Sequence, residues 1–194
     1  ARNRMMKRGY KIEDLCAFYS EECHYSLDTA AMILGIRKEN IIKIPCDQDR
    51  KMNSAALQKT MFKISTEGKV PFFLCAIAGT TVAGVFDNIE EMANICRKYD
   101  NCWLHVDGAH GASIILSKKY KKLLTGIDLA DSIVWDWHKL MGVPLICSVF
   151  LTQHGDELNF HSQSKEATSY LFHSNKDNSD DVNLGIYSLQ CGRR

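Results

Sequence analysis

The sequence predicts an α/β protein whose sheet is mostly parallel. Short apolar runs alternate along the chain with segments of helical periodicity, which is the pattern of parallel strands joined by helical crossovers. The run FFLCAIA at residues 72–78 is continuously apolar between Pro71 and Gly79, as expected for a strand covered on both faces. The composition agrees with a globular segment about one domain long, because 45% of the 194 residues are apolar and 24% are charged.

Six strands are expected in chain order. They are LCAFY at 15–19, IIKI at 41–44, FFLCAIA at 72–78, WLHVD at 103–107, DSIVW at 131–135 and ICSVFL at 146–151. Helices are expected in three of the segments between them. Ser26 is expected to cap a helix that ends at Gly35, and Asn53 or Ser54 to begin a second helix that ends near residue 68. Asp87 is the expected cap of a third helix over IEEMANICRKY.

Charge and cysteine usage narrow the class of protein. With 24 basic and 23 acidic residues the net charge is +1, so the basic surface of a nucleic-acid-binding protein is not expected. No apolar stretch approaches the roughly 20 residues that span a bilayer, and no signal core follows the first residues. The eight cysteines form no CxxC pair, which favours free thiols in a reducing, cytoplasmic setting. The chain lacks an initiator Met and stops at CGRR, so we expect a piece of a longer protein.

Polar residues follow several of the expected strands at the point where each strand ends. His24 follows the first strand, Thr80 the third, Asp107 ends the fourth, and His138 and Lys139 follow the fifth. In open α/β sheets ligands bind beyond the carboxyl ends of the strands. We therefore expect any chemistry to lie at this edge of the sheet.

The types of these residues suggest one kind of chemistry if they converge. A partly desolvated Lys139 would present a neutral amine that forms a Schiff base with an aldehyde. Asp107, at the tip of a buried strand, needs a cation or donor, and a protonated pyridinium nitrogen would provide it. The imidazole of His24 could stack on an aromatic ring and shuttle a proton, and Thr80 brings a hydroxyl. Taken singly, each residue also has an ordinary structural explanation in a turn, a cap or the surface.

A metal site is the competing hypothesis. In HVDGAH, the period of two places His105 and Asp107 on one face of a strand, with His110 close by, which is similar to a metal-ligand triad. This spacing arises easily by chance. It also gives Lys139 and His24 no role.

Six sequence blocks in one unbroken order carry a family resemblance from about residue 12 to the end. The blocks are SEECHYS, AGTTVAGVFDN, HVDGAHGAS, ADSIVWDWHKLMGVPLICS, ATSYLF and LQCGR. Together they resemble the group II pyridoxal-phosphate-dependent amino-acid decarboxylases, in the glutamate and cysteine-sulfinate decarboxylase branch. The resemblance implies the fold type I large domain of aspartate-aminotransferase type, with a mostly parallel seven-stranded sheet. It also implies obligate homodimers with active sites at the subunit interface.

The resemblance further implies how the chain divides into domains. Residues 1–152 would be part of the large domain that binds pyridoxal 5'-phosphate. Residues 153–194 would be the end of that domain with a mobile loop. The N-terminal phosphate-binding segment and the C-terminal small domain would be absent from this chain.

The family resemblance also assigns roles to single residues. It makes Lys139 the lysine that forms a Schiff base with the cofactor, Asp107 the partner of the pyridinium nitrogen, and His24 the stacking residue. Lys139 and His24 are then the candidates for handling protons. The remaining implied cofactor contacts are Ala109 on the ring face opposite His24, Thr80 near the ring oxygen, and His138 near the phosphate.

The activity implied is a lyase reaction, in which a small, acidic or diamino L-amino acid loses CO2 and becomes its amine. Two positions depart from the family pattern. Asp136 stands where the family usually has an Asn that helps to hold the phosphate, so Asp136 is expected to point elsewhere or to reach the phosphate through a bridging donor. Asn178 stands where the mobile loop normally carries a proton-donating Tyr. Other chemistry on the same cofactor, such as transamination or oxidation, and a non-catalytic dimer partner therefore stay open as alternatives. The terminal Arg193 and Arg194 are expected to be structural.

Overall fold

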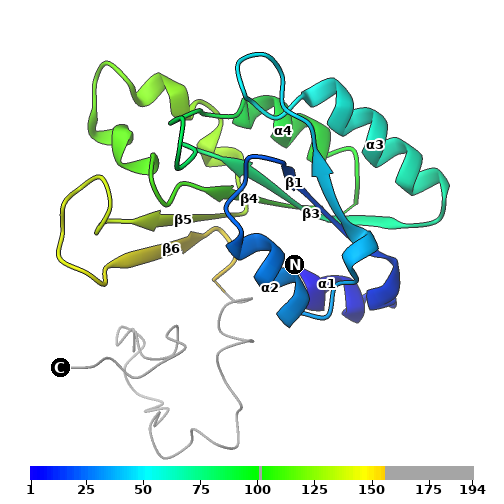
Figure 1. Cartoon of the computed structure of the whole chain (residues 1–194). Helices are drawn as coiled ribbons and strands as arrows, with labels where there is room; N and C mark the ends of the chain where they lie inside the picture. The colour runs from blue at the N-terminus through cyan, green and yellow to red at the C-terminus, as the bar shows by residue number, and fades with distance from the viewer. Residues whose placement is uncertain (101, 156–194) are drawn as a thin grey trace, which may run out of the picture. The chain divides into compact units, whose positions relative to one another are not determined.

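The computed structural model describes residues 1–100 and 102–155 (Figure 1). The chain divides into two compact units, Ala1–Leu151 and Thr152–Arg194, and the fold described below is that of the first. The expected mobile loop with Asn178, and the terminal Arg193 and Arg194, lie outside the described residues.

Six strands of the described chain form one sheet in the order β2-β1-β3-β4-β5-β6 (Figure 1). The strands are β1 (Leu15–Ser20), β2 (Ile41–Ile44), β3 (Val70–Ile77), β4 (Trp103–Asp107), β5 (Ser132–Asp136) and β6 (Ser148–Thr152). β1 pairs in parallel with β2 and β3, β3 with β4, and β4 with β5. The predicted mostly parallel α/β fold is confirmed, and each predicted strand is present with only its ends displaced.

Helices cover both faces of this sheet. α3 and α4 lie on one side of it, and α1 and α2 on the other (Figure 1). The helices are α1 (Arg2–Lys7), α2 (Ser26–Ile33), α3 (Ser54–Thr66) and α4 (Ile89–Cys96). Short 3₁₀ helices span Ile12–Asp14, Lys38–Asn40, Ala112–Leu116, Lys121–Leu124 and Ile127–Leu129. None of the helices in this part of the chain is long and apolar enough to cross a membrane.

The interior strands are apolar because both of their faces are covered. All six residues of β1 are buried, and Phe18 packs in the core beneath α3 and α4 with Leu74 of β3 and Leu104 of β4. On the other face Leu15 and Phe72 pack against Met5 of α1. The seven cysteines among the described residues are free thiols, as predicted. Because helices cover both faces of the sheet, its interior strands are mainly apolar, and the predicted site residues lie where the strands end.

Helix starts agree with the sequence at one position and differ at two. Asn53 caps α3 as predicted, because its side-chain oxygen accepts the N–H of Ala56 at 2.9 Å. Asp87 is not the cap of α4. Its neighbour Asn88 is, accepting the N–H of Glu91 at 3.3 Å.

The predicted Ser26 cap is also wrong. α2 begins at Ser26 itself and has no side-chain cap, since the Ser26 hydroxyl is hydrogen-bonded to His24 instead. The predicted end of this helix is confirmed, because Gly35 adopts φ +75°, a left-handed conformation that suits glycine.

Asp87 acts inside the fold. Its side chain is buried, and its two carboxylate oxygens accept the N–H of Met52 at 2.7 Å and the N–H of Ile77 at 2.8 Å. Burial raises the pKa of Asp87 above its ordinary value, although these two hydrogen bonds oppose the shift. The carboxylate therefore ties the end of β3 to the segment that precedes α3.

Replacing Asp87 with Asn tests this tie. Asparagine has one acceptor oxygen, so either Met52 or Ile77 would keep a buried N–H without an acceptor. We expect the free energy of unfolding to fall by about 1–3 kcal/mol. Urea denaturation of the variant measures this as a lower midpoint at an unchanged slope. Asp100→Asn, which removes one carboxylate from an exposed ion pair with Arg8, is the control. Equal stabilities of the two variants would contradict the role given to Asp87.

Candidate active site

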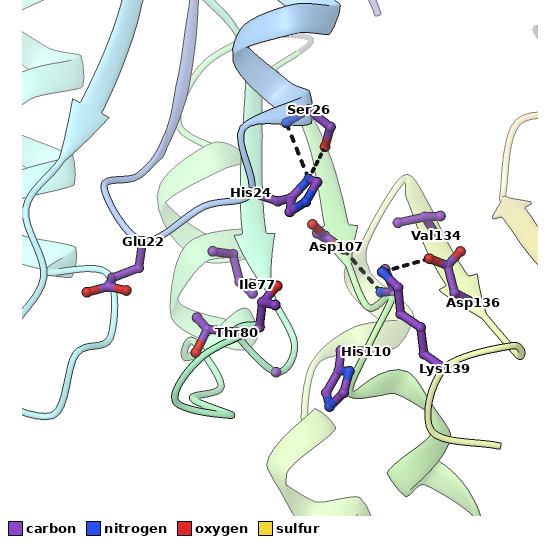
Figure 2. A pocket seen from close by; sticks show the side chains of 13 residues that line it. Glu22, His24, Ser26, Ile77, Thr80, Asp107, His110, Val134, Asp136 and Lys139 are labelled. Carbon is purple, nitrogen blue, oxygen red and sulfur yellow. Dashed lines mark hydrogen bonds and ion pairs between the residues drawn. The ribbon is translucent and has the colours of Figure 1, made fainter. Parts of the chain in front are cut away.

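A cavity of about 210 Å³ lies where β1, β3, β4 and β5 end (Figure 2). Its walls come from the segments that follow these strands, as expected for a parallel sheet. Five of the residues predicted from the sequence line it: His24, Thr80, Asp107, Ala109 and Lys139. The structure thus brings residues from four distant segments of the chain to one hollow.

Asp107 is the last residue of β4 and is partly buried at the cavity wall. Its Oδ1 accepts the N–H of Ala109 at 3.1 Å, which holds the carboxyl group at the mouth of the strand. Its Oδ2 makes no hydrogen bond to any other residue in 1–100 and 102–155. One carboxylate oxygen is therefore left for a donor or cation inside the cavity.

Lys139 reaches the same cavity from the turn that follows β5. Its Nζ lies 2.8 Å from Oδ2 of Asp136, whose side chain is only 13% exposed (Figure 2). Burial raises the pKa of Asp136, but the hydrogen bonds from Lys139 and Ser148 lower it by more, and the pKa lies below its ordinary value. The carboxylate of Asp136 is therefore paired with the amine of Lys139. Its contact with a phosphate through a bridging donor stays a prediction.

His24 lies in the loop between β1 and α2. Its Nδ1 is 2.8 Å from the hydroxyl oxygen of Ser26 and accepts the Ser26 N–H at 3.3 Å. The ring is in contact with Tyr25, with centroids 4.3 Å apart, and lies at the cavity wall (Figure 2). Both bonds hold the imidazole through the same nitrogen, so Nε2 is the atom left for a ligand.

Thr80 shapes the wall opposite His24. Its Oγ1 accepts the N–H of Val85 at 3.0 Å, and its own N–H donates to the Val85 carbonyl at 2.9 Å. The turn starts at Gly79, where φ is +91° and a Cβ would lie 2.8 Å from Cα of Gly111. Gly111 is as crowded, because a Cβ there would collide with the Ala78 carbonyl oxygen. Two glycines that the sequence analysis did not single out thus let the segments after β3 and β4 touch.

Two histidines lie away from the cavity. His138 does not line it, and its Nδ1 lies 2.8 Å from the Cys147 carbonyl oxygen, so its place near a phosphate stays a prediction. His105 stacks between Phe73 and Phe150 at 6.0 and 6.2 Å, with Nδ1 2.8 Å from the Ser132 hydroxyl oxygen.

The three residues of the metal hypothesis, His105, Asp107 and His110, do not come together among the described residues. The described residues contain no group of three His, Cys, Asp or Glu side chains that could hold a metal ion. Along a strand each residue adds about 3.3 Å, so His105 stands roughly 6.6 Å behind Asp107 and inside the packed sheet. Burial accordingly lowers the pKa of His105. His110 lines the cavity without it.

The sequence of residues 1–194 matches the profile of the pyridoxal-dependent decarboxylase conserved domain along its whole length. The chain belongs to the pyridoxal-dependent decarboxylase family. It is 38% identical to glutamate decarboxylase of Drosophila melanogaster over 181 residues, which are 92% of this chain and 35% of that protein. It is 41% identical to human acidic amino acid decarboxylase GADL1 over 180 residues, which are 93% of this chain and 34% of that protein.

Solved structures of decarboxylases agree with this assignment. A crystal structure of mouse CSAD superposes with a TM-score of 0.82 at 34% identity, covering 93% of this chain and 37% of the mouse chain. The chain therefore spans about a third of the length of the family members that it matches. The family resemblance and the fold type I architecture predicted from the sequence are confirmed.

An anchoring network behind the site fixes the first turn of α2 in this family member. Oδ1 of Asp28 accepts the Tyr19 hydroxyl at 2.9 Å, and Oδ2 pairs with Nζ of Lys43 at 3.0 Å. Burial raises the pKa of Asp28, but the bonds from Lys43 and Tyr19 lower it by more, so the pKa lies below its ordinary value. Asp28 thus links α2 to β1 and β2 just beyond His24 and Ser26.

Because the folded-state pKa of Asp28 is depressed, its ionised form stabilises the fold above the unfolded-state pKa of about 4 and loses this effect at lower pH. We expect Asp28→Asn to lower the free energy of unfolding at pH 7 by about 0.5–1 kcal/mol, a small value because both partners are partly exposed. The difference from the parent protein should shrink as the pH falls below about 4. Chemical denaturation over a pH series measures it. Glu67→Gln, in the exposed pair with Lys63, is the control, and a pH-independent Asp28 effect would contradict the network.

Proposed function

We propose that the full-length protein containing this chain removes CO2 from a small L-amino acid with pyridoxal 5'-phosphate held in this cavity. One observation carries the proposal. The amine of Lys139 and the half-used carboxylate of Asp107, 32 positions apart in the sequence, line the same hollow at the carboxyl edge of the sheet. The 31 residues 108–138 lie between Asp107 and Lys139, so chain proximity does not explain the pairing.

The residues present fit this cofactor. Lys139 supplies an amine for its aldehyde, Asp107 an unpaired oxygen for its ring nitrogen, and His24 a flat ring beside it. Ala109, whose N–H fixes Asp107, is small enough to lie against a second ring face. When bound, the cofactor withdraws the electrons left on the substrate carbon as CO2 departs.

In this proposal the side chains of the cavity mainly hold protons and stabilise charges. Asp107 keeps the ring nitrogen protonated, because an ionised carboxylate stabilises a neighbouring cation. Lys139 must lose a proton before its amine can attack an aldehyde, and until then the ionised carboxylate of Asp136, at 2.8 Å, stabilises the ammonium form. The cavity lies where strands covered on both faces end. Water is partly excluded there, so these charges interact more strongly than they would in bulk solvent.

An acidic substrate is favoured over a diamino one. The family members cited above are called glutamate decarboxylase and acidic amino acid decarboxylase, and the chain is 38–41% identical to them. We further propose a cytoplasmic homodimer with the active site at the subunit interface, as the family resemblance implies. Asn178, at the expected position of the loop Tyr, favours transamination or oxidation as the alternative chemistry, and Asp136 favours a non-catalytic dimer partner as the other alternative.

Replacing Lys139 tests the covalent attachment. The full-length protein is incubated with pyridoxal phosphate, reduced with borohydride, digested and analysed by mass spectrometry. We expect the parent to carry a reduced adduct on Lys139, and Lys139→Ala to carry none because its side chain has no amine. Lys63→Ala, on the exposed face of α3, should label like the parent. An adduct at another lysine in the parent, or no adduct, would rule out the role of Lys139.

Asp107→Asn tests the electronic role of the carboxylate. The neutral amide cannot hold a proton on the ring nitrogen, so we expect kcat to fall about 100- to 1000-fold while the adduct on Lys139 still forms. Release of CO2 from a panel of acidic and diamino acids measures the rate. Asp100→Asn is the matched control. Unchanged turnover in Asp107→Asn would contradict the assignment, and keto acids or aldehydes in place of amine and CO2 would select the alternative chemistry.

A further inference from the structure

The hydrogen bonds of His24 carry information about where its proton lies. Ser26 is the first residue of α2, a position at which a backbone N–H has no acceptor within its own helix. This N–H points at Nδ1 of His24, with the two nitrogens 3.3 Å apart. The Ser26 hydroxyl lies 2.8 Å from the same nitrogen. His24 therefore takes the place of the missing side-chain cap of α2.

A backbone N–H only donates, so the 3.3 Å contact uses the Nδ1 lone pair, whereas the Ser26 hydroxyl at 2.8 Å can serve as donor or acceptor. A neutral imidazole carries one hydrogen, which must then lie on the other nitrogen, Nε2. A hydrogen on Nδ1 would face the Ser26 N–H directly, and that exposed donor would then have only solvent as its acceptor. We propose that Ser26 is a positioning residue that fixes His24 in the Nε2–H tautomer, so that the ring offers a hydrogen-bond donor to the ligand in the cavity.

Ser26 can impose this choice because its own position is fixed. Two residues further along the helix, Asp28 is bonded to Tyr19 of β1 and to Lys43 of β2. These bonds hold the first turn of α2 against β1 and β2, and they thereby fix the direction of the Ser26 N–H. Rotation of the imidazole away from Ser26 would cost both hydrogen bonds at once.

The consequence for the site rests on the proposed function. Nε2 of His24 makes no hydrogen bond to another residue in the part of the chain that the structure describes. With a hydrogen on Nε2 and Nδ1 occupied, the ring has no lone pair free to accept a proton from a ligand. His24 would hold an anionic oxygen, such as a carboxylate, and would not act as a base. Proton acceptance would then fall to the neutral amine of Lys139 and not to His24.

Nitrogen NMR reads the tautomer directly and needs no activity. Long-range ¹H–¹⁵N spectra of the full-length protein, labelled with ¹⁵N-histidine and free of cofactor, are compared with those of His24→Gln to assign the ring. We expect Nε2 to show the shift of a protonated ring nitrogen and Nδ1 that of an unprotonated one. The reverse pattern, or averaged shifts for both nitrogens, would overturn the proposal.

Three variants test whether Ser26 acts on the His24 ring itself or only stabilises α2. Ser26→Ala loses the 2.8 Å bond, so the Nδ1 resonance should move toward that of an unbonded nitrogen. Ser26→Thr keeps a hydroxyl and should restore the parent shift. Thr29→Ala removes a hydroxyl from the next part of the same helix and should leave it unchanged. An unmoved resonance in Ser26→Ala, or equal movement in Thr29→Ala, would overturn the role of Ser26.

The same samples distinguish this proposal from the proposed function. Pyridoxal phosphate is added after the spectra are recorded, and its attachment is followed by absorbance. A protein that shows the Nε2–H tautomer and binds no cofactor would support the role of Ser26 and contradict the proposed function. A protein that binds the cofactor with the opposite tautomer would do the reverse.

Discussion

Parallel pairing of β1, β3, β4 and β5 is the constraint on which the site depends. Strands that run in one direction end at one edge, so the residues after them meet there even when they are far apart in sequence. Helices on both faces favour apolar residues in the interior strands, and the polar residues of the site lie where the strands end. The cavity is therefore assembled from four loops by the direction of the sheet, and each loop has only to supply one or two side chains.

Hydrogen bonds from the main chain then fix those side chains at useful angles. The N–H of Ala109 holds Asp107, and the N–H of Ser26 holds His24. Asp87 works in the opposite sense, since its side chain holds the main chain at the end of β3. Lys139 is held instead by the charged side chain of Asp136, so its amine can change partners without any movement of the backbone.

The sequence was informative wherever a short rule applied. Apolar runs located the strands, and the rule that ligands bind at strand ends selected Asp107 and Lys139 before any contact was known. Rules of this kind predict which face of a strand a residue lies on, but not how far it lies from the strand end. They therefore grouped His105 with Asp107, although His105 lies inside the sheet. They also selected Asp87 as the cap of α4 in place of Asn88, because the bond that occupies Asp87 comes from a segment more than 30 residues away.

The contact between Gly79 and Gly111 limits how this site can change over time. A single methyl group at either position would meet the other segment below van der Waals distance, so neither wall can be reshaped there by small mutational steps. A change of ligand would therefore need substitutions elsewhere on the cavity wall, for example at Glu22 or His110. The wall at Gly79 and Gly111 is therefore fixed by close packing, whereas the wall at Glu22 and His110 can vary.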